Sequence, residues 1–262
     1  MGRRKVGFAV GAIVIALAML GAQSAGAVTG TTAFTCKKKA VEGGAGFSDA
    51  HCVNGVGSGA KYEHVEIPAN TKTELLVTNA STTKETTAAQ PVFLKTTLAG
   101  VEVELEAKEA RNVGSFENLV AANGEHYIHG TGTTTYGEIV ANKPAGKGCK
   151  VNEGVLTTKL LTGTSAGKGM AGTLTPAEGL TFGEIKTEGC SIAAINNTYP
   201  VTGAVTCSGE GSTALCSHAS VTASSTLKFG GQKAGVDVST TFTGRAPGES
   251  EYTPLGVTTV TT

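Results

Sequence analysis

The chain has 262 residues, of which 21 are basic and 21 are acidic, so its formal net charge is zero. This length allows one large domain or two smaller ones, and the charge balance excludes the extended basic surface that nucleic-acid binding requires. The 37 glycines, the many threonines, the lack of Trp and an aromatic content of 5% predict an all-β protein. They argue against the flat aromatic platforms that sugar-binding and single-strand-binding modules use.

Residues 1–27 have the pattern of a secretory signal peptide. A basic cluster at positions 3–5 precedes an apolar run at 6–20, and Ala-Gly-Ala at 25–27 provides the small residues that signal peptidase requires. The apolar run is shorter than the roughly 20 residues of a membrane span. We therefore expect cleavage and a secreted or cell-envelope-associated protein; association with the membrane is expected only if the leader is retained.

Residues 28–81 predict a small β module. Cys36 and Cys52 flank a glycine-rich stretch, a spacing that suits a hairpin closed by its own disulfide. Strands are expected at 62–67 and 74–78, with a turn between them. The polar segment 82–90 has little to bury and is predicted to be a linker.

Residues 91–262 predict an antiparallel β-sandwich domain, with an irregular barrel as the alternative. The clearest signal is a hairpin of 92–98 and 101–107 around Ala99-Gly100, because Val and Leu alternate with Glu in its second strand. A short helical turn is expected at 115–122. Short Thr/Val/Leu runs separated by glycine turns then predict further strands: 126–128, 133–140, 154–161, 170–175, 180–186, 200–207, 220–229 and 235–243.

The six cysteines all follow the leader, which in an exported chain predicts three disulfides. Pairing each cysteine with its nearest neighbour gives the following set: Cys36–Cys52, Cys149–Cys190 and Cys207–Cys216. The main rival is Cys190–Cys207, because both residues flank a predicted turn at Asn196-Asn197 and could face each other across a hairpin.

No cofactor and no metal site are predicted. The chain has no C-x-x-C pair, and His126 and His129 would point to opposite faces of a strand, so they could not bind one ion together. With only two aspartates in the chain, the carboxylate-rich loops of calcium-binding modules are also absent.

No catalytic residue is predicted either. Ser165 completes a G-x-S-x-G pattern, but a poor helix follows it, and the order of the later His and Asp is reversed. The G-x-G-x-x-G match at 167–172 lacks a strand-to-helix crossover, so no nucleotide site is expected. Glu102, Glu104 and Glu106 repeat on one strand face, which is typical of a solvated face rather than a pair of catalytic carboxylates.

Several stretches together carry a family resemblance: Gly148-Cys-Lys-Val, Leu156-Thr-Thr-Lys, 182–190, Thr198–Gly203, Leu227–Gly235 and Tyr252–Leu255. Over residues 130–262 the chain resembles a family of exported, paralogous β-rich proteins of soil actinobacteria, whose function is unassigned. The resemblance implies export and a β fold. It implies no activity.

The functional hypothesis is a secreted or envelope-associated structural or binding protein, not an enzyme, with an unknown surface or extracellular partner. One alternative is a secreted hydrolase whose site is assembled from distant strands. Another is a carrier of small apolar ligands, which would require an open barrel with an empty lumen.

Overall fold

The computed structural model describes residues 28–82, 87–144, 148–166, 171–210, 213–217 and 226–261. The predicted leader lies outside this part. Strands dominate it, and its only helices are the single-turn 3-10 segments η1 (Asn152–Gly154) and η2 (Ala193–Ile195). The prediction of an all-β protein is therefore confirmed.

The strands of the first half are β1 (Val28–Lys38), β2 (Gly46–Phe47), β3 (Gly55–Val56), β4 (Tyr62–Glu66), β5 (Thr73–Thr78), β6 (Ala80–Thr82), β7 (Thr87–Ala89), β8 (Val92–Leu98), β9 (Val101–Val120) and β10 (His126–Lys143). Those of the second half are β11 (Lys150–Val151), β12 (Leu156–Thr157), β13 (Leu161–Ala166), β14 (Ala171–Pro176), β15 (Thr181–Glu188), β16 (Thr198–Thr202), β17 (Val205–Glu210), β18 (Thr213–Ser217), β19 (Lys228–Phe229), β20 (Gln232–Arg245) and β21 (Thr253–Thr261).

The main sheet closes on itself. Strands β9, β10, β13, β14, β17, β18 and β20 pair in this order, each antiparallel to the next. Both β5 and β8 then pair with β20 on one side and with β9 on the other, at different heights, and so complete the circle. We call this closed sheet the ring; a ring removes the free edges of an open sheet. The arrangement is the irregular-barrel alternative rather than the sandwich.

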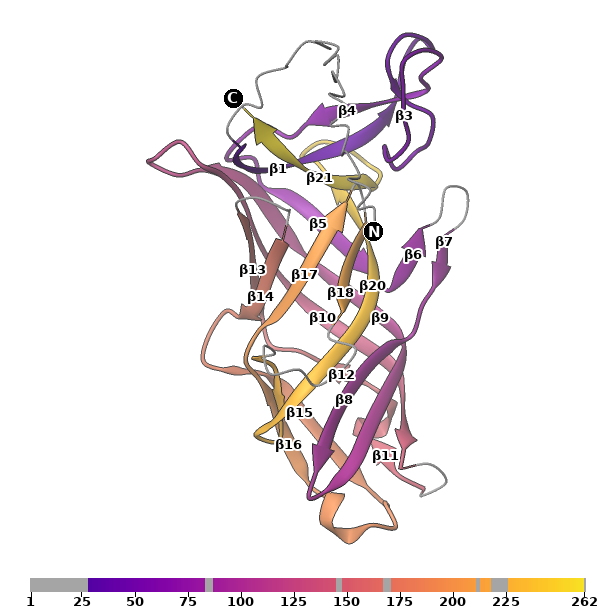
Figure 1. Cartoon of the computed structure of the whole chain (residues 1–262), viewed down its shortest axis with the longest axis vertical. Helices are drawn as coiled ribbons and strands as arrows, with labels where there is room; N and C mark the ends of the chain where they lie inside the picture. The colour runs from indigo at the N-terminus through magenta and orange to yellow at the C-terminus, as the bar shows by residue number, and fades with distance from the viewer. Residues whose placement is uncertain are drawn as a thin grey trace, which may run out of the picture.

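Three long strands extend the ring into an elongated molecule. β9, β10 and β20 have 20, 18 and 14 residues and run along the long axis in Figure 1. At the lower end in this view, β15 pairs with β11 and β16, and β19 joins β16 to β20. A backbone hydrogen bond from Lys159 to Phe182 (2.7 Å) links this end to the segment after β12. Buried Phe229, Leu161 and Ile195 form part of its core.

The inward face of β9 changes phase along the strand. Val103, Leu105 and Ala107 are buried, but further along the buried residues are Phe116 and Asn118, which have the opposite parity. Where the phase changes, β9 has no strand partner on one side, because β5 has ended and β8 has not yet begun. The side chain of Asn79 fills this break: it accepts a hydrogen bond from the Ala110 N–H (2.7 Å) and donates to the carbonyls of Lys108 and Gln90 (2.7 and 2.6 Å).

The upper end is covered by both ends of the described chain. β1 pairs along β21 and β4, and it touches β10 where Gly30 lies beside His126. A Cβ atom at Gly30 would collide with the carbonyl oxygen of His126, so this approach requires glycine. Asn118, only 4% exposed, exchanges hydrogen bonds with both backbone groups of Ala33 (2.8 and 2.9 Å) and donates to the Ile67 carbonyl (2.8 Å).

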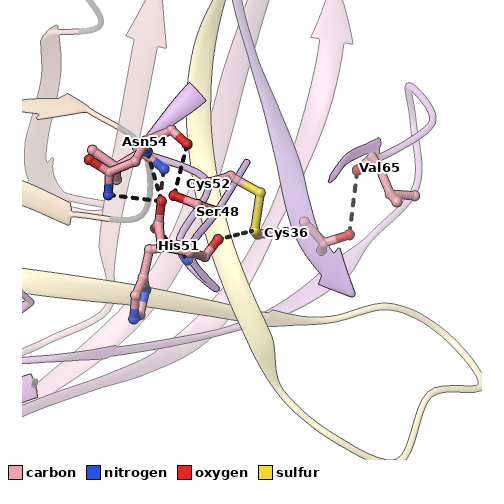
Figure 2. Close-up of a disulfide and its surroundings, with 9 residues drawn as sticks. Cys36, Ser48, His51, Cys52, Asn54 and Val65 are labelled. Atoms are coloured by element: carbon pink, nitrogen blue, oxygen red, sulfur yellow. Dashed lines mark hydrogen bonds between the residues drawn. A yellow bond between two sulfur atoms is a disulfide. The ribbon is translucent and has the colours of Figure 1, made fainter. Parts of the chain in front are cut away.

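A small disulfide-bonded module extends from this end. It consists of β2, β3, β4 and the end of β1, and the Cys36–Cys52 bridge ties its loop to β1 (Figure 2). Asp49 organises the loop by accepting hydrogen bonds from the backbone N–H groups of His51, Val53 and Asn54. Burial raises the pKa of the Asp49 carboxyl, but these bonds outweigh burial and hold the pKa below its ordinary value.

The ring of His64 is stacked between two phenylalanines of the module. Its centroid lies 3.5 Å from that of Phe34 and 4.2 Å from that of Phe47. Burial lowers the pKa of the His64 imidazole below 6.5, although a hydrogen bond with the backbone of Cys52 partly opposes this shift.

Three expectations need correction. The N-terminal module is smaller than 28–81, because Thr73–Thr78 forms β5 and belongs to the ring. The expected linker 82–90 is in part the second strand of a β6–β7 hairpin, while residues 83–86 lie outside the described part. No helical turn forms at 115–122: Ser115 lies within β9, where pairing with both β10 and β5 overrides the local capping signal.

We expect the substitution Asn118→Ala to lower the free energy of unfolding by about 2–4 kcal/mol, because buried backbone groups of Ala33 and Ile67 lose their partners. Asn142→Ala is the matched control, since this amide bonds to Glu106 on the outer face of the ring (2.6 Å); its cost should stay below about 1 kcal/mol. Urea denaturation measures both. Equal losses in the two variants would contradict the role given to Asn118.

We also expect stability to fall with pH below 6.5. Because folding lowers the pKa of His64, the unfolded chain binds more protons in this range, and each further decrease in pH favours it. His64→Phe keeps a stacking ring but removes the titrating group. The melting temperature of this variant should therefore decrease less steeply as the pH falls below 6.5. His51, whose pKa burial also lowers despite nearby Asp49, should keep its own share of the pH dependence. An unchanged slope in His64→Phe would contradict this assignment.

Candidate functional site

The ring surrounds a cavity of about 350 Å³, which is partly open. Its walls are the inward-facing residues of the ring strands, from Leu255 and Val257 near the upper end to Val201 and Leu227 near the lower end. We call this cavity the lumen. Residues of the buried cluster of Ala33, Ile67, Phe116 and Leu255 and of the larger cluster of the lower end contribute to its walls.

Glycine at inward-facing positions explains why the ring is hollow. Gly130, Gly163 and Gly172 line the lumen on three neighbouring strands, β10, β13 and β14. A Cβ atom at Gly130 would lie 3.5 Å from the Cβ of Phe116, and one at Gly172 would lie 3.7 Å from that of Ser165, both ordinary contact distances. The backbone therefore does not require glycine there, and the missing side chains leave space inside the ring.

The lining carries no charge. Its side chains are mostly aliphatic or aromatic, and no Asp, Glu, Lys, Arg or His is among the lining residues in the described part. Several polar groups that do line the lumen bond to one another: Asn112 donates to Thr134 Oγ1 (2.9 Å), and Thr158 Oγ1 accepts from the Thr134 N–H (3.0 Å). The interior is thus a suitable environment for an uncharged apolar molecule.

Tyr136 and Ser165 both line the lumen, and their hydroxyl groups make no hydrogen bond among the described residues. Burial raises the pKa of the Tyr136 phenol to about 12, although the residue as a whole is only half-buried. The oxygen of Ser165, by contrast, is covered by protein atoms.

The two disulfides with both partners described, Cys36–Cys52 and Cys149–Cys190, lie away from the middle of the lumen. Cys149–Cys190 continues the pairing of β11 with β15 at the lower end, with 4.0 Å between Cα atoms. Together with Cys36–Cys52 it forms two of the predicted nearest-neighbour pairs, and it excludes the rival Cys190–Cys207. Cys207 is also disulfide-bonded and lines the lumen, whereas the side chain of its predicted partner, Cys216, lies outside the described ones.

The serine of the G-x-S-x-G pattern lies on the wall of the ring. Ser165 is a residue of β13, opposite Ile128 and Gly172, and Gly167 lies outside the described part. No cluster of three or more His, Cys, Asp or Glu residues that could hold a metal ion occurs in the residues placed by the structure.

The glutamates Glu102, Glu104 and Glu106 of β9 all have partners. Glu102 pairs with Lys143 (2.8 Å) and Glu104 with Lys95 (3.4 Å), while Glu106 accepts a hydrogen bond from Asn142. Their partners on neighbouring strands satisfy them outside the lumen, as expected for a solvated strand face.

Sequence reasoning missed the lumen. The expected strands 126–128 and 133–140 are parts of one strand, because β10 runs through Gly130 and Gly132 without interruption. A possible signal was the spacing itself, because glycines two residues apart point to the same side of a strand.

No protein family model, curated protein or solved structure matches the chain. The resemblance to exported actinobacterial proteins therefore stays a prediction. Within the residues described here, no helix is long and apolar enough to span a bilayer.

We expect a third disulfide between Cys207 and Cys216. β17 pairs with β18 through Ser208 and Leu215, and the same register continued by one residue brings positions 207 and 216 opposite each other. Mass mapping of peptides from the non-reduced protein should recover this pair. Alkylation of Cys216 without prior reduction would contradict it.

Proposed function

We propose that this chain is an exported binding protein that encloses a small apolar ligand in the lumen of its ring. The observation that carries the proposal is a cavity of about 350 Å³ whose described lining is apolar and free of charge. Its size falls in the range of small-molecule sites, roughly 300–1,000 Å³. The proposal follows the carrier alternative and keeps the expectation of a binding protein.

The energetics favour an apolar occupant. Removing apolar surface from water is worth roughly 25 cal/mol per Å², so a ligand that buries about 300 Å² gains about 7 kcal/mol before the cost of immobilising it is subtracted. Because the ring already exists before the ligand enters, little of this gain is needed to order the protein.

Two further observations support an exported protein. Residues 1–27 have the signal-peptide pattern, and disulfides such as Cys36–Cys52 and Cys149–Cys190 are typical of oxidising compartments. A ligand-binding ring braced by disulfides would suit an extracellular or cell-envelope location. The hydrolase alternative needs two carboxylates, or a serine beside a histidine, along the cavity, and no observation in the described lining favours it.

Filling the lumen should abolish binding. We expect the uncharged dye N-phenylnaphthylamine to fluoresce on binding the native protein, and the double variant Gly130→Leu, Gly172→Leu to weaken this binding at least about ten-fold, because both new side chains project into the lumen. Fluorescence titration gives the two dissociation constants.

The matched control is Gly137→Leu on the same strand. Gly137 does not line the lumen, and a Cβ atom there would lie 3.5 Å from the Cβ of Glu109, an ordinary contact. Its dye affinity should equal that of the native protein. The proposal fails if the native protein binds no dye, or if the double variant binds as tightly as the control.

A further inference from the structure

The lumen discriminates by charge. An ionised carboxylate or ammonium group that enters it would lose its hydration and find no opposite charge on the described lining. Such a transfer is far more costly than that of a neutral hydroxyl or carbonyl, which needs only one hydrogen bond to replace what water supplied. The chemistry of the lining therefore selects uncharged ligands.

Tyr136 provides one hydrogen-bonding group that such a ligand can reach. The residue lies on β10 between Ala110 of β9 and Leu156 of β12, so its immediate neighbours in the sheet are apolar. A buried tyrosine hydroxyl usually finds a partner, but this one has none among the described residues. The phenol can donate one hydrogen bond to a ligand and accept another.

Ser165 also carries an unpartnered hydroxyl in the lining, and it differs from Tyr136 in two ways. Its oxygen is covered by protein, so a ligand could reach it only after the side chain rotates. It also lies level with Ile128, eight residues before Tyr136 on β10, a separation of roughly 26 Å along a strand. The wall between these levels includes Gly130 and Gly132, which have no side chain, and Thr134, whose hydroxyl accepts a hydrogen bond from Asn112.

We infer that the ligand is an uncharged amphiphile, a long apolar chain with a hydroxyl or carbonyl group, and that the hydroxyl of Tyr136 binds this polar group. The apolar chain extends from there along the glycine-lined part of the lumen. The inference rests on the proposed function and adds to it the chemical class of the ligand and the residue that determines its specificity.

The test measures displacement of N-phenylnaphthylamine by dodecane, dodecanol and dodecanoate, at a pH well above the pKa of the carboxylic acid. For the native protein we expect dodecanol to bind about ten-fold more tightly than dodecane, and dodecanoate to bind at least about a hundred-fold more weakly than dodecanol. These three ligands have the same number of carbon atoms and differ in their polar group.

Two variants locate the hydrogen bond. Tyr136→Phe should remove the preference for dodecanol over dodecane while leaving the affinity for dodecane unchanged, which also shows that the lumen is intact. Ser165→Ala, the matched removal of a hydroxyl from the same lining, should leave the preference unchanged.

The inference is overturned if dodecanoate binds as well as dodecanol, if dodecanol binds no better than dodecane, or if Tyr136→Phe retains the preference. Loss of the preference in Ser165→Ala would likewise overturn the role of Tyr136. If the proposed function itself is wrong, the native protein binds neither the dye nor any of the three ligands. That outcome is distinct from those that overturn the inference.

Discussion

The closed backbone hydrogen-bond ladder is the constraint on which this structure depends. Each ring strand is held by a neighbour on both sides, and the number and stagger of the strands set the width of a closed sheet. Side chains can therefore be removed from the inner face without collapse of the wall. This is why glycines at Gly130, Gly163 and Gly172 leave an open lumen, whereas in a two-layered sandwich the opposing sheets could approach each other.

Where the ladder is interrupted, buried backbone groups would lose their hydrogen-bond partners at a cost in free energy. Buried asparagines occupy these positions. Where β5 gives way to β8, Asn79 replaces the missing backbone partners of β9. Where β1 crosses the upper end, Asn118 does the same for Ala33 and Ile67. A carboxamide has both a donor and an acceptor, so it can substitute for a peptide group where strand pairing stops.

Local sequence patterns predicted those parts of the fold in which neighbours along the chain also pair. The 92–98 and 101–107 hairpin and its glutamate face are observed, since a two-residue turn and strict alternation encode them. The continuation of β9 through Ser115 was not predicted, because β5 and β10 impose it from a distance. The lumen was missed for a related reason: a glycine inside a strand and a glycine in a turn look alike until pairing is known, and Tyr136 belongs to no motif that would mark a binding site.

The pairing of β1 with β21 has a consequence for biogenesis. Phe34 lies opposite Gly256, so the first described strand completes its ladder only when the last one is available. Contacts this distant in sequence make folding slow, and β20, which closes the ring, is also made late. During synthesis the chain would therefore remain without its finished ring, a state that suits the export proposed above, because an export channel accepts only extended polypeptides.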